Sequence, residues 1–169
     1  MRDRLMDGDR REVGAAGSVA DQVIQDDTLL PQLIALLEDD NTAVVAHAAH
    51  ALMQVAMTAP ARFDPHVDRL LDHLEALPQW EIGEQLPKIL VRTALSDAQA
   101  RRLADILEAN THNRSNIVAA CSLQGLVDLA GDQRIETERA VRMIDAALSS
   151  DRKALAARAR RLQKVLPPR

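Results

Sequence analysis

One pattern of small and apolar residues returns four times along the chain. Its copies start at Val44, Ile82, Val118 and Leu155, at steps of 38, 36 and 37 residues. Within each copy, apolar and small residues recur three and four positions apart, which is the spacing of one face of an α-helix. A period of this length with a helix in each copy is typical of chains built from stacked pairs of helices. The period therefore predicts a repetitive helical architecture.

The composition favours helices over sheets. Aromatic residues make up 1% of the 169 residues, with Trp80 and Phe63 as the two members and no tyrosine, so Leu, Ile, Val, Ala and Met must fill the interior. Ala and Leu are the strongest helix formers, and few long β-branched runs are present to build strands. A chain of this length usually forms one domain. We therefore expect a single all-α domain.

Caps, breakers and apolar stripes divide the chain into nine expected helices. Asn41 is a plausible N-cap, Ser96 and Gln99 have capping-box spacing, Pro87 is expected to kink its helix, and Gly131 is expected to end one. Connections of a few residues predict that neighbouring helices pack antiparallel. The expected helices cover about 9–25, 28–37, 42–57, 63–77, 79–94, 96–109, 117–130, 135–148 and 152–165.

The first full copy of the pattern resembles a HEAT repeat. The residues that carry this resemblance are Leu30, Pro31, Leu33, Leu36, Leu37, Asp40, Val44, Ala48, Ala49, Ala51 and Leu52. The resemblance implies a right-handed α-α superhelix, with a half repeat at 9–25, repeats at about 28–57, 63–94, 96–130 and 134–166, a flexible segment 1–8 and a tail 167–169. The family usually has an Arg after the first apolar residue of the second helix, where this chain has Val45, Gly83, Ala119 and Ala156.

Two other helical folds compete with this interpretation. A tetratricopeptide array needs aromatic and glycine positions at a 34-residue period, which a chain without tyrosine does not supply. A plain antiparallel helical bundle satisfies the same short connections and apolar stripes, and it stays open as an alternative.

The repeat geometry predicts which residues line an exposed inner face. Side chains six and nine positions after each anchor lie opposite the core stripe of the second helix. An apolar row beside basic and amide groups suits a groove for a peptide or helix of another protein, with Met57 extending its adaptable floor. The alternative is that packing or self-association covers the row. The sixth positions are His50, Lys88, Gln124 and Arg161, and the ninth positions are Met53, Val91, Val127 and Lys164.

Charge is distributed unevenly. From Asp151 onward the chain has seven Lys or Arg and one Asp, a balance of +6, whereas the first 150 residues carry −10. The last expected helix is basic and amphipathic, with Arg158, Arg160, Arg161 and Lys164 as candidate contacts to phosphates or to an acidic partner. A nucleic-acid-binding protein is therefore the second hypothesis. The alternative is a solvated helix that caps the end of the stack.

Residues that bear catalytic chemistry do not form a recognisable constellation. His47 with His50 and His66 with His73 are the candidate metal ligands, but their directions do not converge, and we expect surface histidines. Cys121 has no base near it in sequence and is expected to pack. Some HEAT-like proteins are DNA glycosylases or bilin lyases, but no residue here carries such chemistry. We predict a non-enzymatic scaffold without cofactor or metal.

The sequence also predicts the compartment. A single cysteine forms no internal disulfide, and the charged beginning of the chain is unlike a signal peptide. The uncharged stretch 41–61 contains two histidines and ends near Pro60, which indicates a packed helix. We expect a cytoplasmic protein.

Overall fold

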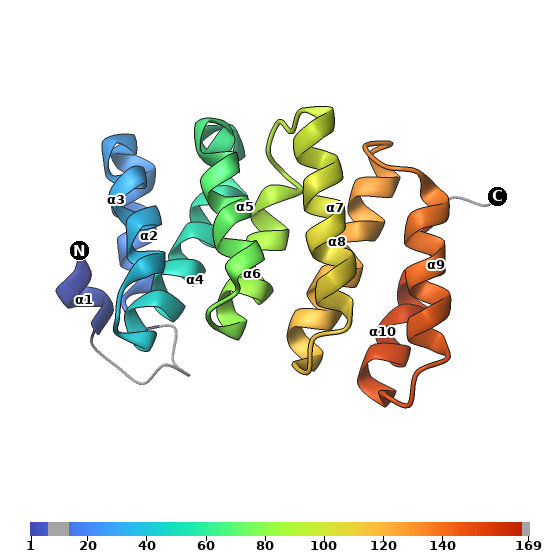
Figure 1. Ribbon diagram of the computed structural model, residues 1–169. Helices are drawn as coiled ribbons and strands as arrows, with labels where there is room; N and C mark the ends of the chain where they lie inside the picture. The colour runs from blue at the N-terminus through green and yellow to red at the C-terminus, as the bar shows by residue number, and fades with distance from the viewer. Residues whose placement is uncertain (7–13, 167–169) are drawn as a thin grey trace. The chain divides into compact units, whose positions relative to one another are not determined.

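A computed structural model of the chain describes residues 1–6 and 14–166. These residues form ten α-helices, three short 3-10 helices and no β-strand (Figure 1). The chain divides into two compact units, Met1–Ala94 and Leu95–Arg169. No helix of the described ranges is long and apolar enough to cross a membrane. The all-α class expected from composition is confirmed.

Unit 1 is built around α4, a helix rich in alanine. Ten of its residues are buried, because it packs against α1, α2, α3 and α6. α6 in turn packs against α5. The small side chains allow these neighbours to approach α4 closely. The elements of unit 1 are α1 Arg2–Met6, α2 Ala16–Gln25, η1 Asp27–Leu29, α3 Leu30–Ala35, η2 Leu36–Glu38, α4 Thr42–Thr58, η3 Pro60–His66, α5 Val67–Ala76 and α6 Trp80–Leu90.

Unit 2 is built in the same way around α8. This helix packs against α7, α9 and α10, and α9 packs against α10. Its core includes Leu103 and Leu107 from α7, Leu126 from α8 and Ile144 from α9, each at most 1% exposed. The helices of unit 2 are α7 Asp97–Thr111, α8 Asn116–Gly131, α9 Thr137–Leu148 and α10 Lys153–Leu162.

The four repeat anchors occupy equivalent positions in their helices. Val44, Ile82, Val118 and Leu155 are each the third residue of α4, α6, α8 and α10, and they are at most 4% exposed. The period read from the sequence is therefore a period of buried helix starts. Each anchored helix follows a partner helix in the chain, which gives the pairs α3–α4, α5–α6, α7–α8 and α9–α10.

The helix starts with clear local signals are confirmed. The Asn41 side chain accepts a hydrogen bond from the Ala43 N–H at 2.9 Å and begins α4. Ser96 and Gln99 form the full capping box of α7, with the Ser96 hydroxyl accepting from the Gln99 N–H at 3.2 Å and the Gln99 side chain accepting from the Ser96 N–H at 3.0 Å.

Several expected helix bounds are wrong. The expected helix 28–37 is split into η1, α3 and η2, and the expected helix 63–77 begins as the 3-10 helix Pro60–His66, which contains Pro65. α6 ends at Leu90, because the N–H groups of Arg92 and Thr93 donate to carbonyls three residues earlier instead of four, which tightens the chain into a turn. The expected helix 9–25 starts at Ala16, since Gly14 has a left-handed φ of 52°. Residues 9–13 of that helix lie outside the described residues.

The beginning of the chain, within the flexible segment expected for residues 1–8, contains a short helix. Arg2–Met6 forms α1, and Leu5 is fully buried. α1 packs against α4 and α2, so tertiary contacts rather than local sequence signals order it. Residues 7 and 8 and the expected tail 167–169 lie outside the described part of the chain.

Candidate docking surface

Three of the predicted binding residues lie on one side of α4. His50, Met53 and Met57 are three and four positions apart, a spacing that places them on the same helix face. Met57 is 62% exposed, and His50 and Met53 are half-buried. We name these three residues the methionine face of α4. It is an apolar and polarisable strip that borders solvent at the carboxyl end of the helix.

Polar groups of α6 border the methionine face. The Gln85 Nε2 atom lies 3.3 Å from His50 Nδ1 and links the two helices. The Lys88 ammonium lies 3.3 Å from Gln85 Oε1 and 3.5 Å from Glu84 Oε1. Gln85 and Glu84 were not among the predicted residues, although their spacing of three and four positions before Lys88 on one helix is a signal for such contacts. The border is thus a hydrogen-bonded network of mixed charge.

Two of the predicted binding residues are buried, and this corrects the expected exposed row. Val91 is 7% exposed and Val127 is 4% exposed. Val91 follows the last residue of α6 but keeps a helical backbone, and its N–H donates to the Pro87 carbonyl at 3.2 Å, so neighbouring elements and not the end of the helix account for its burial. Val127 lies in α8, which packs against three other helices and therefore has little free surface. Neither valine offers an accessible contact to a partner.

Gln124, the predicted contact in unit 2, is half-buried and committed to its own helix. Its Nε2 donates to Asp128 Oδ1 at 2.7 Å. Asp128 lies one turn further along α8, so an acidic group borders the predicted row at this point. The predicted residues of α8 therefore form neither an apolar nor a basic surface.

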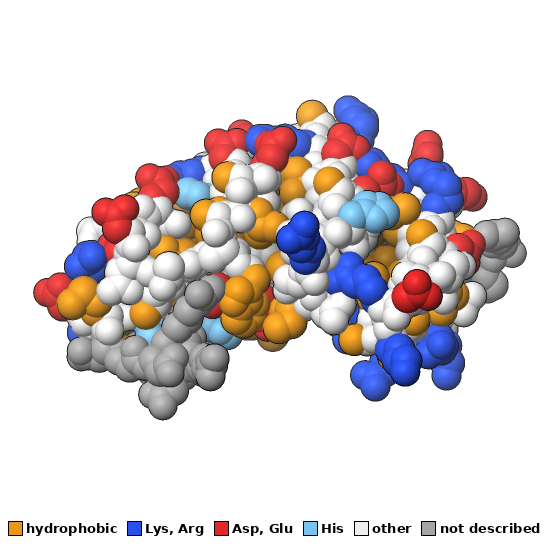
Figure 2. Space-filling model, turned by 60° about the horizontal axis from the view of Figure 1, so that its bottom comes forward, with side chains coloured by type: hydrophobic (Ala, Val, Ile, Leu, Met, Phe, Trp, Pro, Cys, Tyr) orange, Lys and Arg blue, Asp and Glu red, His pale blue; other side chains and the backbone are white. Residues whose placement is uncertain are grey.

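The predicted basic residues do gather at α10. Arg160, Arg161 and Lys164 are exposed, while Leu155, Ala159 and Leu162 are buried on the opposite side. Figure 2 shows Lys and Arg side chains together at the end of unit 2 that α10 forms. Arg158 is half-buried, and its Nε atom is buried without a hydrogen-bond partner among the described residues. The amphipathic basic helix expected from the sequence is confirmed.

The histidines do not converge on a metal site. His47 is fully buried and its Nδ1 donates to the Leu5 carbonyl at 2.8 Å, so the expectation of a surface histidine is wrong there because α1 covers it. His73 lies near Glu38, whereas His66 precedes α5. Within the described ranges, no group of three His, Cys, Asp or Glu side chains is placed to hold a metal ion.

A hollow of about 350 Å³ opens in unit 1 between η2 and α5. Its wall includes Leu37, Glu38, Val45 and His73. The Arg69 guanidinium donates to Glu38 at 2.8 Å and holds the pKa of that carboxyl below its usual value. Burial lowers the pKa of His73, and this outweighs the opposing attraction of Glu38. The hollow is mostly apolar, with one ion pair at its edge.

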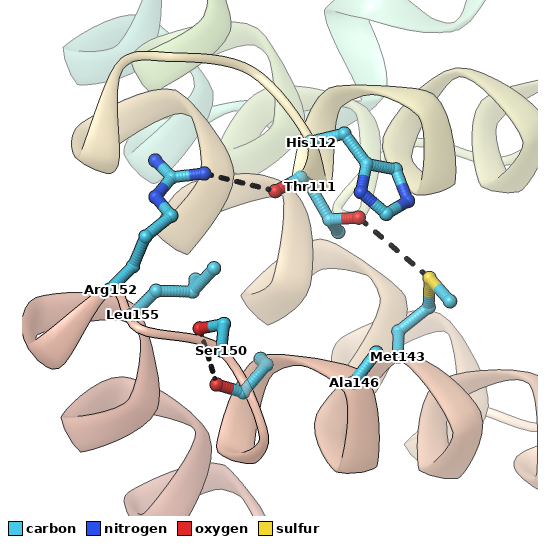
Figure 3. A pocket seen from close by; sticks show the side chains of 8 residues that line it. Thr111, His112, Met143, Ala146, Ser150, Arg152 and Leu155 are labelled. Atoms are coloured by element: carbon cyan, nitrogen blue, oxygen red, sulfur yellow. Dashed lines mark hydrogen bonds between the residues drawn. The ribbon is translucent and has the colours of Figure 1, made fainter.

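A second hollow, of about 210 Å³, lies in unit 2 where the end of α7 meets the α9–α10 turn (Figure 3). The Thr111 hydroxyl donates to the Glu108 carbonyl at 2.7 Å, and the Ser150 hydroxyl donates to the Ala147 carbonyl at 2.8 Å. Arg152 donates to the Thr111 carbonyl at 3.5 Å. These polar groups already donate to backbone carbonyls, so we interpret the hollow as a gap in the packing between helices and not as a ligand site.

A third hollow, of about 460 Å³, is lined by Arg101, Arg134 and Arg139 at the α8–α9 turn. Arg139 forms ion pairs with Glu108 at 2.5 Å and with Asp105, and these acids raise its pKa. The carboxylates offset the positive charge of the wall, so the hollow does not define an anion site.

Comparison with known proteins gives no assignment. No protein-family model matches the chain, and no curated protein matches it. Any functional conclusion therefore depends on the surfaces described above.

Proposed function

We propose that the chain is a non-enzymatic interaction module that binds a peptide or helix of another protein on the methionine face of α4. The observation that carries the proposal is the exposure of Met57 beside Met53 on the same helix face. Long, unbranched methionine side chains adapt to different apolar partners, and proteins use them at peptide-binding surfaces. His50 within this face and Lys88 at its border supply half-buried polar groups, and the buried Gln85 holds both of them through hydrogen bonds.

The architecture proposed with this function is a HEAT-like right-handed superhelix. The equivalent buried anchors and the contacts α2–α4, α4–α6 and α8–α10 between alternate helices support it. In solenoids of this class, the second helices of successive repeats line one surface, and that surface is the usual place for a partner. We propose accordingly that the protein acts as a scaffold in the cytoplasm. A plain helical bundle would remove the reason for expecting a repeated binding surface.

Site-specific photo-crosslinking tests the proposed surface. A photoreactive amino acid at Met57 in the chain expressed in its native cells should give a discrete adduct with a partner protein. The same probe at Ala35, which is exposed on α3, is the matched control and should give none. Met57→Asp should reduce capture of that partner at least tenfold, while Ala35→Asp should not. Equal adducts at both positions, or full capture by Met57→Asp, would refute the proposal.

Nucleic-acid binding is the second candidate, and the exposed Arg160, Arg161 and Lys164 favour it. These residues have no ion-pair partner among the described residues, so they are free to contact phosphates. Retention of labelled duplex DNA or RNA in a gel should then fall steeply between 50 and 200 mM salt. Absence of any shift at the low salt concentration would dispose of this candidate.

A further inference from the structure

The short helix α1 is held on the rest of unit 1 by specific contacts. The Arg2 guanidinium forms a two-pronged ion pair with Asp39, at 2.5 Å from Nε to Oδ2 and 2.9 Å from Nη2 to Oδ1. Arg4 donates to Ser18 at 2.7 Å and also to Gln22, both on α2. Leu5 is fully buried although it belongs to a helix of only five residues.

His47 recognises the carboxyl end of α1. Its Nδ1 donates to the Leu5 carbonyl at 2.8 Å, and this carbonyl belongs to the last turn of a helix, where carbonyls lack partners within the helix. The hydrogen bond from His47 Nδ1 is made to a backbone carbonyl, so any helix that ends at this place could accept it, whatever its side chain there. We name Ser18, Gln22, Asp39 and His47, together with the apolar site of Leu5, the α1 socket.

The α1 socket and the methionine face are neighbouring surfaces of α4. His47 precedes His50 by three positions, roughly 60° around the helix, and lies roughly 120° around it from Met53 and roughly 80° from Met57. α1 therefore covers the buried His47 beside a face that is half-buried at His50 and exposed at Met57. A helix bound on the methionine face and extending toward the start of α4 would meet α1.

We infer that the α1 socket is a binding site for a helix of the pattern Arg-x-x-Leu, and that α1 is an internal occupant which a partner helix of this chemistry displaces. The inference rests on the proposed function, because it specifies the partner and the regulation of the neighbouring methionine face of α4. The Arg of such a helix would pair with the Asp39 carboxylate, and its Leu would fill the apolar site of Leu5. A backbone carbonyl at its carboxyl end would accept the hydrogen bond from His47.

The size of α1 makes it suitable as a replaceable occupant. Isolated helices of this length are not stable in water, so α1 gains its helical form from the socket alone. Its two-pronged ion pair with Asp39 orients α1, and the Arg2 side chain is 47% exposed, so solvent and salt reach the pair from the α1 side. A longer partner helix would place the same groups and add contacts along the methionine face.

Leu5→Asp in the full chain tests whether α1 occupies the socket reversibly, and Met6→Asp is its matched control because Met6 is 44% exposed. Modification of His47 by diethyl pyrocarbonate, followed by mass spectrometry, measures whether the socket is open. We expect His47 to react at least tenfold faster in Leu5→Asp than in wild type or Met6→Asp. The thermal midpoint of Leu5→Asp should stay close to that of Met6→Asp.

The amidated peptide of residues 1–6, added in trans at millimolar concentration, then tests recognition. It should protect His47 of the Leu5→Asp chain from modification, and the same peptide carrying Leu5→Asp should not. Adding Met57→Asp to the chain should leave this protection unchanged, which separates the socket from the proposed function of the methionine face. Unfolding of Leu5→Asp would identify α1 as a structural cap and overturn the inference.

Two further results would overturn it. An unreactive His47 in a folded Leu5→Asp chain would show that α1 does not cover the socket, and a reactive His47 that the peptide fails to protect would show that the socket lacks the specificity inferred. A wild-type dimer that Leu5→Asp abolishes would identify a second copy of the chain as the occupant instead of a different partner.

Discussion

His73 carries its ring at the edge of a mostly apolar hollow, with its side chain 12% exposed. Its Nε2 lies 3.4 Å from Glu38 Oε1 but without hydrogen-bond geometry, so the carboxylate stabilises the protonated ring only by its charge. Burial dominates and lowers the pKa of His73 below its ordinary value of 6.5. At neutral pH the His73 ring is therefore uncharged, which is the form that burial favours.

This environment predicts a stability change with pH. Between the lowered pKa of folded His73 and the ordinary value of 6.5, the unfolded chain binds more protons, so the free energy of unfolding decreases as pH falls through that window. His73→Gln removes the titrating group and should shrink this decrease. Urea unfolding at pH 7.5 and pH 5.0 measures it for both proteins. An equal decrease in the variant and the wild type would contradict the role given to His73.

At the level of elements, the end of α8 shows how a turn departs from its sequence signal. The sequence predicts that Gly131 ends the helix, as glycines at helix ends commonly do in the left-handed conformation. Gly131 is indeed the last helical residue, but the left-handed φ of 57° belongs to Gln133. A Cβ atom added at Gly131 would meet no atom within 4 Å. Position 131 is helical with room for a Cβ atom, so alanine would fit there, and the left-handed position 133 would suit glycine better than glutamine.

Exchanging these roles should stabilise the turn. Gly131→Ala should raise the free energy of unfolding by about 0.5–1 kcal/mol, because alanine loses less conformational entropy in a helix. Gln133→Gly should also be stabilising, by up to about 1 kcal/mol, because it removes the cost of a left-handed side-chain residue. Gln133→Val is the contrasting control and should destabilise. Denaturant unfolding of the three variants tests this, and a loss of stability in Gly131→Ala would contradict it.

The sequence predicted helices best where their signals are local. Asn41 and Ser96 begin helices through their own side chains, so α4 and α7 could be located without any knowledge of packing. α1 could not be predicted, because five residues become helical only through the burial of Leu5 against distant helices. The 3-10 helix that contains Pro65 was predicted in part as an α-helix, because Phe63 continues the apolar stripe of the α-helix that follows it.

At the level of the whole molecule, the repeat period located the anchors but not the accessible surface. Counting nine positions from each anchor assumes that every second helix has the same neighbours. Val91 is buried although it keeps a helical backbone at the end of α6, and Val127 is buried in α8, which has three helical neighbours, so neither valine shares the partial exposure of Met53. A surface depends on what covers it, and a single-helix pattern contains no such information.

Charge is also divided between the two units. Unit 1 contains eight Lys or Arg and sixteen Asp or Glu, whereas unit 2 contains thirteen and nine, giving net charges of −8 and +4. The proposed peptide site and the basic α10 thus belong to units of opposite charge. A basic partner helix of the kind inferred for the α1 socket is electrostatically suited to unit 1.

The division into two compact units predicts where core damage spreads. Leu52 in α4 and Leu126 in α8 are fully buried in different units, and truncating either one to alanine should cost about 2–5 kcal/mol. In a chain whose helix pairs are stabilised mainly by their nearest neighbours, the loss stays close to the altered pair. Hydrogen exchange measured by mass spectrometry should therefore show lost protection in unit 1 for Leu52→Ala and in unit 2 for Leu126→Ala. Met57→Ala and Ile117→Ala, at exposed positions of the same two helices, are the controls and should change protection little. Uniform loss of protection along all the helices in either core variant would mean that the chain unfolds as one cooperative body, and the nearest-neighbour account of its stability would then fail.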